Sequence, residues 1–495
     1  MQKKSNNPIT KEKISNPNTS DNNLKKFVDN HKNKKIVVVQ GLGFVGAVMS
    51  LVVCNSKKNE YAVIGIDLKS NQKIIDSINC GIFPIESSDQ KIQNYFNNAI
   101  KKKNFFATHD TSAYRFADII IVDINLDVMK KSDFDRNLDS YNVDLNPFKS
   151  AIRTIGNNCK QDVLILVETT VPPGTCLKVV KPIINEELSK RKLPTENVKI
   201  GHSYERVMPG PDYIDSIKNF YRVFSGIDKK SADETESFLR SIISTKKYPL
   251  TRLVNTNATE MAKVLENSYR AMNIAFIVEW SRFAEEANVN LYEIIDAIRM
   301  RPTHSNLMYP GIGVGGYCLT KDPLLASWSR KNHFGSNSIL EQSEQGVRIN
   351  DKMPIYAFDF MKRAFKIDSL NKKNILLLGV SYRSDVGDTR YSPVEFFYLK
   401  CFNEGANIET NDPYVKYWEE IDIDVSQDLD SQLNKEWDII VFSTGHKQYN
   451  TEKYINKLSK MKNVMFYDPL GFLSTKSISL LKNDNELKVL GRGDI

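Results

Sequence analysis

The fold is decided by the stretch Lys35-Ile36-Val37-Val38-Val39-Gln40-Gly41-Leu42-Gly43-Phe44-Val45-Gly46, in which an apolar strand pattern runs directly into a GxGxxG loop and then a helical pattern. Such glycines let the backbone turn tightly and approach a pyrophosphate at a helix N-terminus. Asp67 ends the next apolar run, where a carboxylate accepts hydrogen bonds from ribose hydroxyls and repels a 2′-phosphate. The stretch therefore predicts NAD rather than NADP, bound by Gly41, Gly43, Phe44, Val45, Gly46 and Asp67; the alternative is a purely structural glycine turn.

Further strand patterns follow outward from this stretch. Residues 62–66, 119–122 and 163–167 are continuous runs rich in Val, Ile and Leu, typical of strands buried on both faces of a parallel sheet. They predict a doubly wound α/β domain, with the cofactor at its strand ends, over residues 35–225.

The texture then becomes helical. Apolar residues recur at helical spacing from Asn257 to about Asn288, without Gly or Pro, which predicts one long helix with Asn257 and Glu260 as its capping pair. Strand patterns return at 373–379, 437–442 and 464–468. We expect two Rossmann-like doubly wound domains, at 35–225 and 346–495, joined by a central helical region at 226–345, with a cleft where two nucleotides meet.

The N-terminal segment and the distribution of charge limit the classes of function that the chain could have. The net charge is +8, but residues 1–35 carry nine Lys against three acids, so only +2 remains for the other 460 residues. The polar segment 1–34 is expected to be a disordered tail, either a solvated arm or a basic anchor, and nucleic acid is not expected as a partner. The chain shows neither an apolar run long enough to cross a membrane nor a secretory signal, and none of its six cysteines forms a CxxC pair. We expect a cytoplasmic enzyme without a structural metal.

One cysteine stands out. Cys318 follows Gly313-Val314-Gly315-Gly316-Tyr317 and precedes Lys321 and Asp322, so a ligand can approach closely and a nearby cation favours the thiolate. An isolated Cys in a glycine turn is more often a small core residue. The neighbouring motifs favour the reactive reading.

Those motifs bring polar groups to the same cleft. Glu260, Lys263 and Asn267 share one helix face, which either points into the cleft or forms a surface salt-bridge row. Thr170 follows the strand at 163–167, and Glu205 with Arg206 follows a strand pattern at 199–202. Open α/β sheets bind ligands at such strand ends, although each motif alone also fits turn chemistry.

With these motifs the chain resembles the UDP-glucose/GDP-mannose dehydrogenase family over nearly all of residues 35–480. Seven elements occur in family order, the last being Asp388-Thr389-Arg390-Tyr391-Ser392-Pro393 and the strand-end Asp412-Pro413. The resemblance implies an NAD-dependent four-electron oxidation of a UDP-sugar C6 alcohol to a uronic acid for polysaccharide biosynthesis, through a thiohemiacetal and then a thioester on Cys318. It also implies a UDP-binding C-terminal domain and a homodimer built on the long helix.

The resemblance assigns the residues as well. Lys263 and Asn267 donate to the developing oxyanion, Glu205 is the general base, and Thr170 and Asp322 place or activate water. Thr170 also lies at the cofactor. The implied substrate-binding residues are Glu205, Arg206, Lys263, Asn267, Gly315, Gly316 and Arg390, the last suited to phosphate.

The substrate and its rivals remain open at this point. Asp123-Ile124-Asn125-Leu126-Asp127 replaces the family's usual Pro-Thr-Pro, Tyr204 replaces a Pro, and Tyr317 replaces a His or Ser. Glu205-Arg206-Val207-Met208-Pro209-Gly210 resembles the branch that oxidises UDP-N-acetylhexosamines such as UDP-N-acetylmannosamine, whereas Lys321-Asp322 resembles the UDP-glucose branch. The sequence favours the first. Rival functions are a two-electron 3-hydroxyacid-type dehydrogenase and a catalytically silent module that binds NAD or nucleotide sugar.

Overall fold

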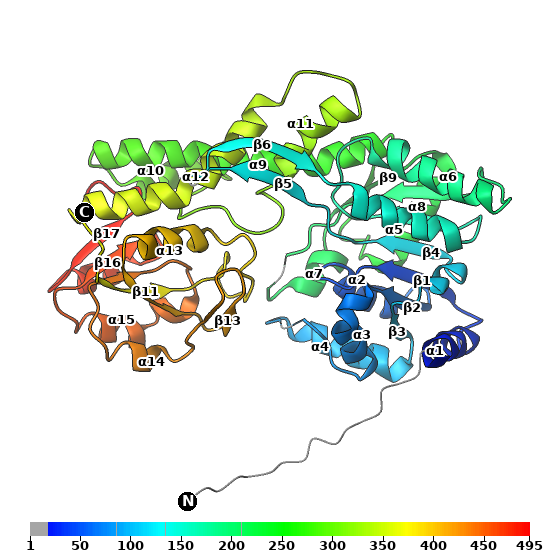
Figure 1. Ribbon diagram of the computed structural model, residues 1–495, viewed down its shortest axis with the longest axis horizontal. Coiled ribbons are helices and arrows are strands. Elements are labelled where there is room, and N and C mark those ends of the chain that lie inside the picture. Colours follow the sequence, from blue (N-terminus) through cyan, green and yellow to red (C-terminus); the bar gives the residue numbers. More distant parts are fainter. Residues whose placement is uncertain (1–17, 86, 134, 209) are drawn as a thin grey trace, which may run out of the picture.

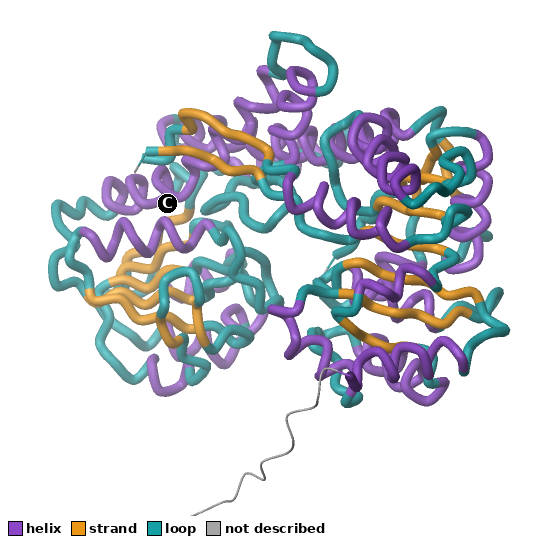
Figure 2. The backbone as a smooth tube through the Cα atoms, turned by 45° about the vertical axis from the view of Figure 1, so that its right-hand side comes forward, coloured by secondary structure: helices purple, strands orange, loops and turns teal. Residues whose placement is uncertain are grey.

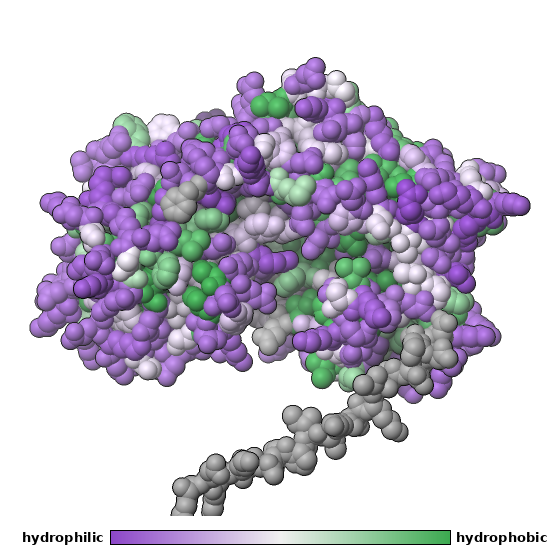
Figure 3. All heavy atoms as spheres, in the orientation of Figure 1, coloured by the Kyte–Doolittle hydropathy of each residue, from purple (hydrophilic) through white to green (hydrophobic). Residues whose placement is uncertain are grey.

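The computed structural model describes residues 18–85, 87–133, 135–208 and 210–495 and has two α/β lobes joined by long helices (Figure 1). The lobes lie side by side below the connecting helices, and the space-filling view shows a hollow between them (Figure 3). This arrangement confirms the expected fold of two Rossmann-like units with a long central helix.

An eight-stranded sheet is the core of the first lobe, in the order β10-β9-β8-β7-β4-β1-β2-β3. Neighbouring strands are parallel except β8 and β9. Because helices cover both faces, alternate residues of one strand, such as Val37 and Val38, enter two separate apolar cores. The sheet runs past the domain boundary predicted at residue 225. Its strands are β1 (Lys35–Gln40), β2 (Tyr61–Ile66), β3 (Phe105–Thr108), β4 (Ile119–Val122), β7 (Leu164–Val167), β8 (Lys199–His202), β9 (Arg222–Gly226) and β10 (Leu250–Arg252).

Helices of the first lobe follow the strands as the sequence pattern indicates. The helix after β1 is almost wholly buried, since it lies directly behind the glycine loop. The helices are α2 (Gly46–Cys54), α3 (Gln72–Asn79), α4 (Gln90–Lys102), α5 (Asn146–Asn158), α6 (Lys181–Lys190), α7 (Tyr213–Lys218) and α8 (Lys229–Ile242).

The N-terminal segment for which a disordered tail was predicted contains a helix. Residues 1–17 lie outside the described residues, but α1 (Asn18–Asp29) is a helix. Leu24 is buried, and Phe27 stacks on Phe106 of β3 with ring centroids 5.5 Å apart. The prediction is therefore wrong for residues 18–34, because three apolar residues at helical spacing, Leu24, Phe27 and Val28, are enough to dock the helix.

The predicted long helix is α9 (Thr256–Glu286). Its N-cap is Asn255, whose side chain accepts from the Ala258 N–H, so the predicted Asn257–Glu260 capping pair is wrong. α9 packs along α12 and α11 and forms the bridge between the lobes. The other central helices are α10 (Leu291–Arg299), α11 (Asp322–Asn332) and α12 (Glu341–Ala364).

An antiparallel hairpin, β5 (Val128–Ser132) with β6 (Leu138–Val143), leaves the first lobe between β4 and α5. It reaches across the central helices toward the second lobe (Figures 1 and 2). Lys130 pairs with Asp351 of α12 at 2.7 Å, and Asp135 pairs with Lys400 of the second lobe at 2.8 Å. The hairpin therefore ties the first lobe to the other two parts of the chain.

The second lobe has a five-stranded parallel sheet, in the order β12-β11-β15-β16-β17, with apolar cores on both faces. Its strands are β11 (Asn374–Leu378), β12 (Asn407–Asn411), β15 (Ile439–Val441), β16 (Met465–Asp468) and β17 (Glu486–Val489), with a small ladder of β13 (Tyr417–Trp418) and β14 (Ile423–Asp424). Its helices are α13 (Pro393–Asn403), α14 (Leu429–Gln432), α15 (Glu452–Leu458) and α16 (Thr475–Leu481). Across the residues that the structure describes, no helix is both long and apolar enough to span a membrane.

Candidate active site

The glycine loop after β1 has the geometry of a phosphate cradle. Gly41 has φ +98°, and a Cβ on it would lie 2.0 Å from the Asp123 carbonyl oxygen. A Cβ on Gly46 would lie 2.0 Å from the Gly41 carbonyl oxygen. In contrast, no atom lies within 4 Å of a Cβ built on Gly43, so that position faces open space. Gly41 and Gly46 allow the tight turn, and Gly43 leaves room for a pyrophosphate at the start of α2.

Asp67 lies at the end of β2, beside this loop. One of its carboxylate oxygens accepts from the Leu42 N–H at 2.8 Å, and the other accepts from Asn71 Nδ2 at 2.8 Å. These bonds hold the acid at the strand end, where it remains partly exposed. The residues present therefore fit the adenosine half of NAD and its free ribose hydroxyls.

A cavity of about 480 Å³ opens in front of the loop and is shared by both lobes. Phe44 and Tyr213 line it from the first lobe, and Asp388 and Tyr414 line it from the second. The Arg390 guanidinium lies 4.4 Å from the centre of the Phe44 ring, and it forms two hydrogen bonds with Asp388. Arg390 is thus brought to the cofactor loop by a stacking contact between the lobes.

Cys318 lies at the surface of the cleft, in the segment that connects the central helices. The surrounding protein desolvates the thiolate and, with the Asp322 carboxylate, raises the thiol pKa to about 11. The Lys263 and Lys321 ammonium groups oppose this shift. In the resting protein Cys318 is therefore a protonated thiol influenced by the Asp322 and Glu205 carboxylates and by two ammonium groups.

Lys263 and Asn267 extend from α9 toward the segment that holds Cys318 and Asp322. The Lys263 side chain is buried and donates to the Glu205 carbonyl at 2.8 Å. Burial lowers the Lys263 pKa, but Glu205, Cys318 and Asp322 outweigh burial and raise it overall. Asn267 Nδ2 donates to Asp322 at 2.6 Å, which holds Asp322 beside the thiol.

The residue before Glu205 is Tyr204, whose ring contacts two cationic side chains. The buried Tyr204 ring lies 5.4 Å from the Lys263 ammonium and 5.1 Å from the Arg206 guanidinium. Arg206 also pairs with Glu266 at 2.8 Å. The Glu205 carboxylate accepts from the Val207 N–H. The structure thus directs Arg206 toward Glu266 of α9 and brings Glu205 to Lys263.

Two further residues named from the sequence, Glu260 and Thr170, lie at the loop that follows β7. Glu260 is on the buried face of α9, but its carboxylate accepts from the Gly174 and Cys176 N–H groups at 2.6 and 2.8 Å, and burial raises its pKa to about 7. It holds the loop that begins at Thr170, which is partly buried at the end of β7. Glu260 therefore neither points into the cleft nor joins a salt-bridge row on the surface, which were the two alternatives for this helix face.

Gly315 and Gly316 are close-approach positions, but the group that approaches is protein. A Cβ on Gly315 would lie 2.5 Å from Tyr382 Cβ, and a Cβ on Gly316, where φ is +78°, would lie 2.8 Å from the Tyr382 ring. The two glycines therefore let the second lobe close onto the Cys318 segment.

Two polar residues near this site, Glu168 and Arg222, were not predicted from the sequence, whereas Lys321 was expected near Cys318. Glu168, at the end of β7, is buried against Arg222, and burial raises the Glu168 pKa to about 7. Lys321 is buried and pairs with Asp322 at 2.7 Å. Glu168 and Arg222 form a buried ion pair, and no spacing of residues in the sequence indicates such a pair. Their position at strand ends was the available signal.

Comparison with known proteins matches the geometry. The NAD-binding, central and UDP-binding domains of the UDP-glucose/GDP-mannose dehydrogenase family match residues 34–243, 257–352 and 376–475. A UDP-N-acetyl-D-mannosamine dehydrogenase of Methanococcus maripaludis is 30% identical over 93% of this chain and 97% of its own length. The relative of the same description from Pyrococcus horikoshii is 26% identical over 93% of this chain and its own full length.

Solved structures agree. The structure of a UDP-D-ManNAc dehydrogenase from Pyrococcus horikoshii superposes with a TM-score of 0.77 at 25% identity, covering 93% of this chain and 100% of that one. Three domains in family order, an NAD cradle and a cysteine in the cleft between two nucleotide-binding lobes lead to one conclusion: the chain belongs to the UDP-glucose/GDP-mannose dehydrogenase family and is an NAD-dependent nucleotide-sugar dehydrogenase.

Proposed function

We propose that this enzyme oxidises the C6 alcohol of a UDP-N-acetylhexosamine, such as UDP-N-acetylmannosamine, to the uronic acid used in polysaccharide biosynthesis. The observation that carries the proposal is the exposed thiol of Cys318, held beside Lys263 and Asp322 between the two lobes. The choice of an N-acetylhexosamine is supported by the similarity to the UDP-N-acetyl-D-mannosamine dehydrogenases of Methanococcus maripaludis and Pyrococcus horikoshii.

The chemistry assigned to Cys318 is covalent. When bound, NAD supplies the acceptor for each of the two hydrides that the sugar carbon loses. The thiol adds to the C6 aldehyde, with its sulfur bonding to carbon and its proton passing to oxygen, and so holds a thiohemiacetal. After the second hydride and the hydroxyl proton leave, Cys318 carries a thioester. Water then adds to the carbonyl and the thiol departs, which leaves a carboxylate and the free cysteine.

The neighbours of Cys318 have matching roles in this proposal. Lys263 and Asn267 donate to the oxygen on C6 as negative charge develops there, and preorganised donors of this kind contribute several kcal/mol. Glu205 accepts the alcohol proton as general base. Asp322, with Thr170, places the attacking water. Burial and the Asp322 carboxylate together keep Cys318 protonated in the resting enzyme.

The remaining contacts are assigned to binding. In our proposal the cradle of Gly41, Gly43, Phe44, Val45 and Gly46, with Asp67 and Thr170, holds the cofactor. Arg390 reaches the nucleotide sugar from the second lobe and shares the cleft with it. Arg206 is already paired with Glu266. Its proposed role in substrate binding is therefore indirect: it orders the Glu205 segment.

We also propose a homodimer built on α9. A row of large apolar side chains on this helix, Met261, Leu265, Tyr269, Phe276, Trp280 and Phe283, is exposed. Leu265 is 65% exposed and Phe283 is 59% exposed, and a continuous apolar stripe of this kind marks an interaction surface. A second copy of the chain is the partner. Light scattering should give twice the chain mass for the wild type, and the variant L265E should shift it toward the monomer.

The cytoplasm is the proposed location, because the reaction needs Cys318 as a free thiol, which a reducing compartment preserves.

A panel of UDP-hexoses and UDP-N-acetylhexosamines tests the function. We expect the highest kcat/KM for an N-acetylhexosamine, with two NADH formed for each uronate. A preference for UDP-glucose would contradict the sugar assignment. One NADH with an accumulating aldehyde or ketone would instead contradict the four-electron reaction.

A further inference from the structure

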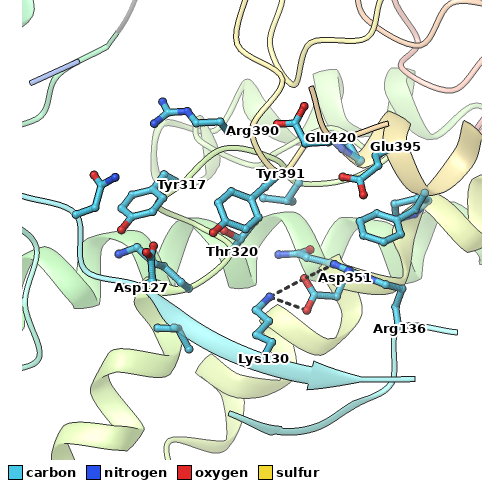
Figure 4. A pocket seen from close by; sticks show the side chains of 18 residues that line it. Asp127, Lys130, Arg136, Tyr317, Thr320, Asp351, Arg390, Tyr391, Glu395 and Glu420 are labelled. Carbon is cyan, nitrogen blue, oxygen red and sulfur yellow. Dashed lines mark hydrogen bonds and ion pairs between the residues drawn. The ribbon is translucent and has the colours of Figure 1, made fainter. Parts of the chain in front are cut away.

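A second cavity, of about 580 Å³, is lined by Arg390 (Figure 4), whose guanidinium also stacks on Phe44 of the first cavity. The end of β4, the β5–β6 hairpin, the Cys318 segment, α12 and the start of α13 enclose it. Two buried polar atoms on residues of its wall have no hydrogen-bond partner among the described residues: Arg136 Nε and Asn350 Oδ1. A wall with unpaired polar atoms is typical of a ligand site.

The topology of the first sheet relates this cavity to the cofactor. The order in which the chain adds parallel strands reverses at β1, with β2 and β3 on one side and β4 and β7 on the other. The pyrophosphate cradle follows β1, and Asp67, the ribose acid, follows β2. The opposite half of the dinucleotide therefore extends over the end of β4, which continues into Asn125 and Asp127 of the cavity wall.

Tyr317 fixes the same end of the dinucleotide independently. It lines the cavity and is the residue directly before Cys318. A ring that takes hydride from a carbon held at Cys318 must lie against this segment. The inner end of the cavity is thus the place for the nicotinamide.

Some charged side chains of this wall form ion pairs and others do not. Lys130 pairs with Asp351, Lys321 with Asp322 and Arg390 with Asp388. Three other carboxylates of the wall, Asp127, Glu395 and Glu420, have no ion-pair partner within the part of the chain that the structure describes, and Asp127 is the one that the Tyr317 hydroxyl faces (Figure 4). The Tyr317 and Tyr391 rings lie beside it with their centroids 6.3 Å apart. A carboxylate with two aromatic rings suits a planar cation.

We propose that Asp127, with the rings of Tyr317 and Tyr391, forms a seat that selects the positively charged oxidised nicotinamide ring over the neutral reduced ring. Asp127 and Tyr317 belong to two separate segments in which this chain departs from the family's usual residues, and the fold brings these departures together. The seat loses its attraction once hydride has been accepted. If the proposed two-step oxidation holds, this favours release of the reduced cofactor while the sugar stays on Cys318.

Calorimetric titration of the full-length enzyme with NAD⁺ and with NADH, without sugar, tests the seat. For D127N we expect the NAD⁺ Kd to rise about threefold to tenfold, the range for a cation at an aromatic and acidic site, and the NADH Kd to change less than twofold. D127E keeps the charge and should retain the preference. D139N is the matched control, because Asp139 lies on the same hairpin, is exposed and lines neither cavity.

Salt and aromatic variants give a second measurement. The wild-type preference for NAD⁺ should shrink as salt rises from 0.05 to 0.5 M, whereas that of D127N should change little. Y391L should weaken NAD⁺ more than NADH. Equal weakening of both cofactors by D127N, or no change in either, overturns the proposal. These titrations contain no sugar, so they can succeed even if the assignment of the substrate fails.

Discussion

Replacement of Asp322 by Asn should lower the pKa of the Cys318 thiol. Burial is the largest cause that raises this pKa, which is about 11 in the wild type, and the Asp322 carboxylate is the next. At pH 8, three units below that pKa, only about 0.1% of the thiol is ionised. A carboxylate close to a titrating group shifts its pKa by about 1 unit or more, so D322N should have about 1% thiolate at pH 8.

The assay is the rate of iodoacetamide alkylation at Cys318 as a function of pH. Among the six cysteines, all of which the structure describes, Cys80 and Cys318 are the exposed ones, so the measurement is made in a C80S background. C318S identifies the signal. We expect about tenfold faster alkylation of D322N at pH 8 and a midpoint about one pH unit lower. An unchanged or higher midpoint would refute the assigned electrostatics.

Three further outcomes follow from the site. K263M should lower kcat by about 10²- to 10³-fold, the cost of losing an oxyanion donor, while the NAD Kd measured by titration stays within threefold; an unchanged kcat would remove Lys263 from the reaction. D67A should weaken NAD about tenfold and narrow the preference over NADP, measured by fluorescence titration of the reduced cofactors; a preserved preference would mean that the acid does not contact the ribose. The Glu260 pKa rises from 4.5 toward about 7 on folding, so the folded protein binds more protons than the unfolded chain between those values and stability falls as pH rises through that window. The melting temperature of E260Q should therefore fall less steeply than that of the wild type from pH 4.5 to 7.5, and parallel slopes would contradict the assignment.

Much of the fold could be predicted because its signals are local. The strands at Lys35–Gln40 and Ile119–Val122 are uninterrupted apolar runs, and α9 has an unbroken helical pattern. The docked helix α1 was missed because its sequence is mostly polar and its few apolar contacts involve β3, far along the chain. The hairpin β5–β6 was missed for a similar reason, since its stabilising partners, such as Asp351, are more than 200 residues away.

In the candidate site too, local sequence signals could be predicted and contacts between distant segments could not. Cys318, Lys263 and Asn267 could be placed because they occur at recognisable spacings. The pairing of Arg206 with Glu266 and the packing of Gly316 against Tyr382 could not, because they depend on how separate segments meet. The two unusual segments at Asp127 and Tyr317 likewise gained a meaning only when the fold brought them to one cavity.

The role of Cys318 is tested most directly by the ratio of NADH formed to uronate formed in C318A and in the wild type, with retained NAD and UDP-sugar binding as the control. We expect two NADH per uronate for the wild type and no uronate from C318A, which still binds both ligands. Uronate formation by C318A at the wild-type rate would contradict covalent catalysis by this cysteine.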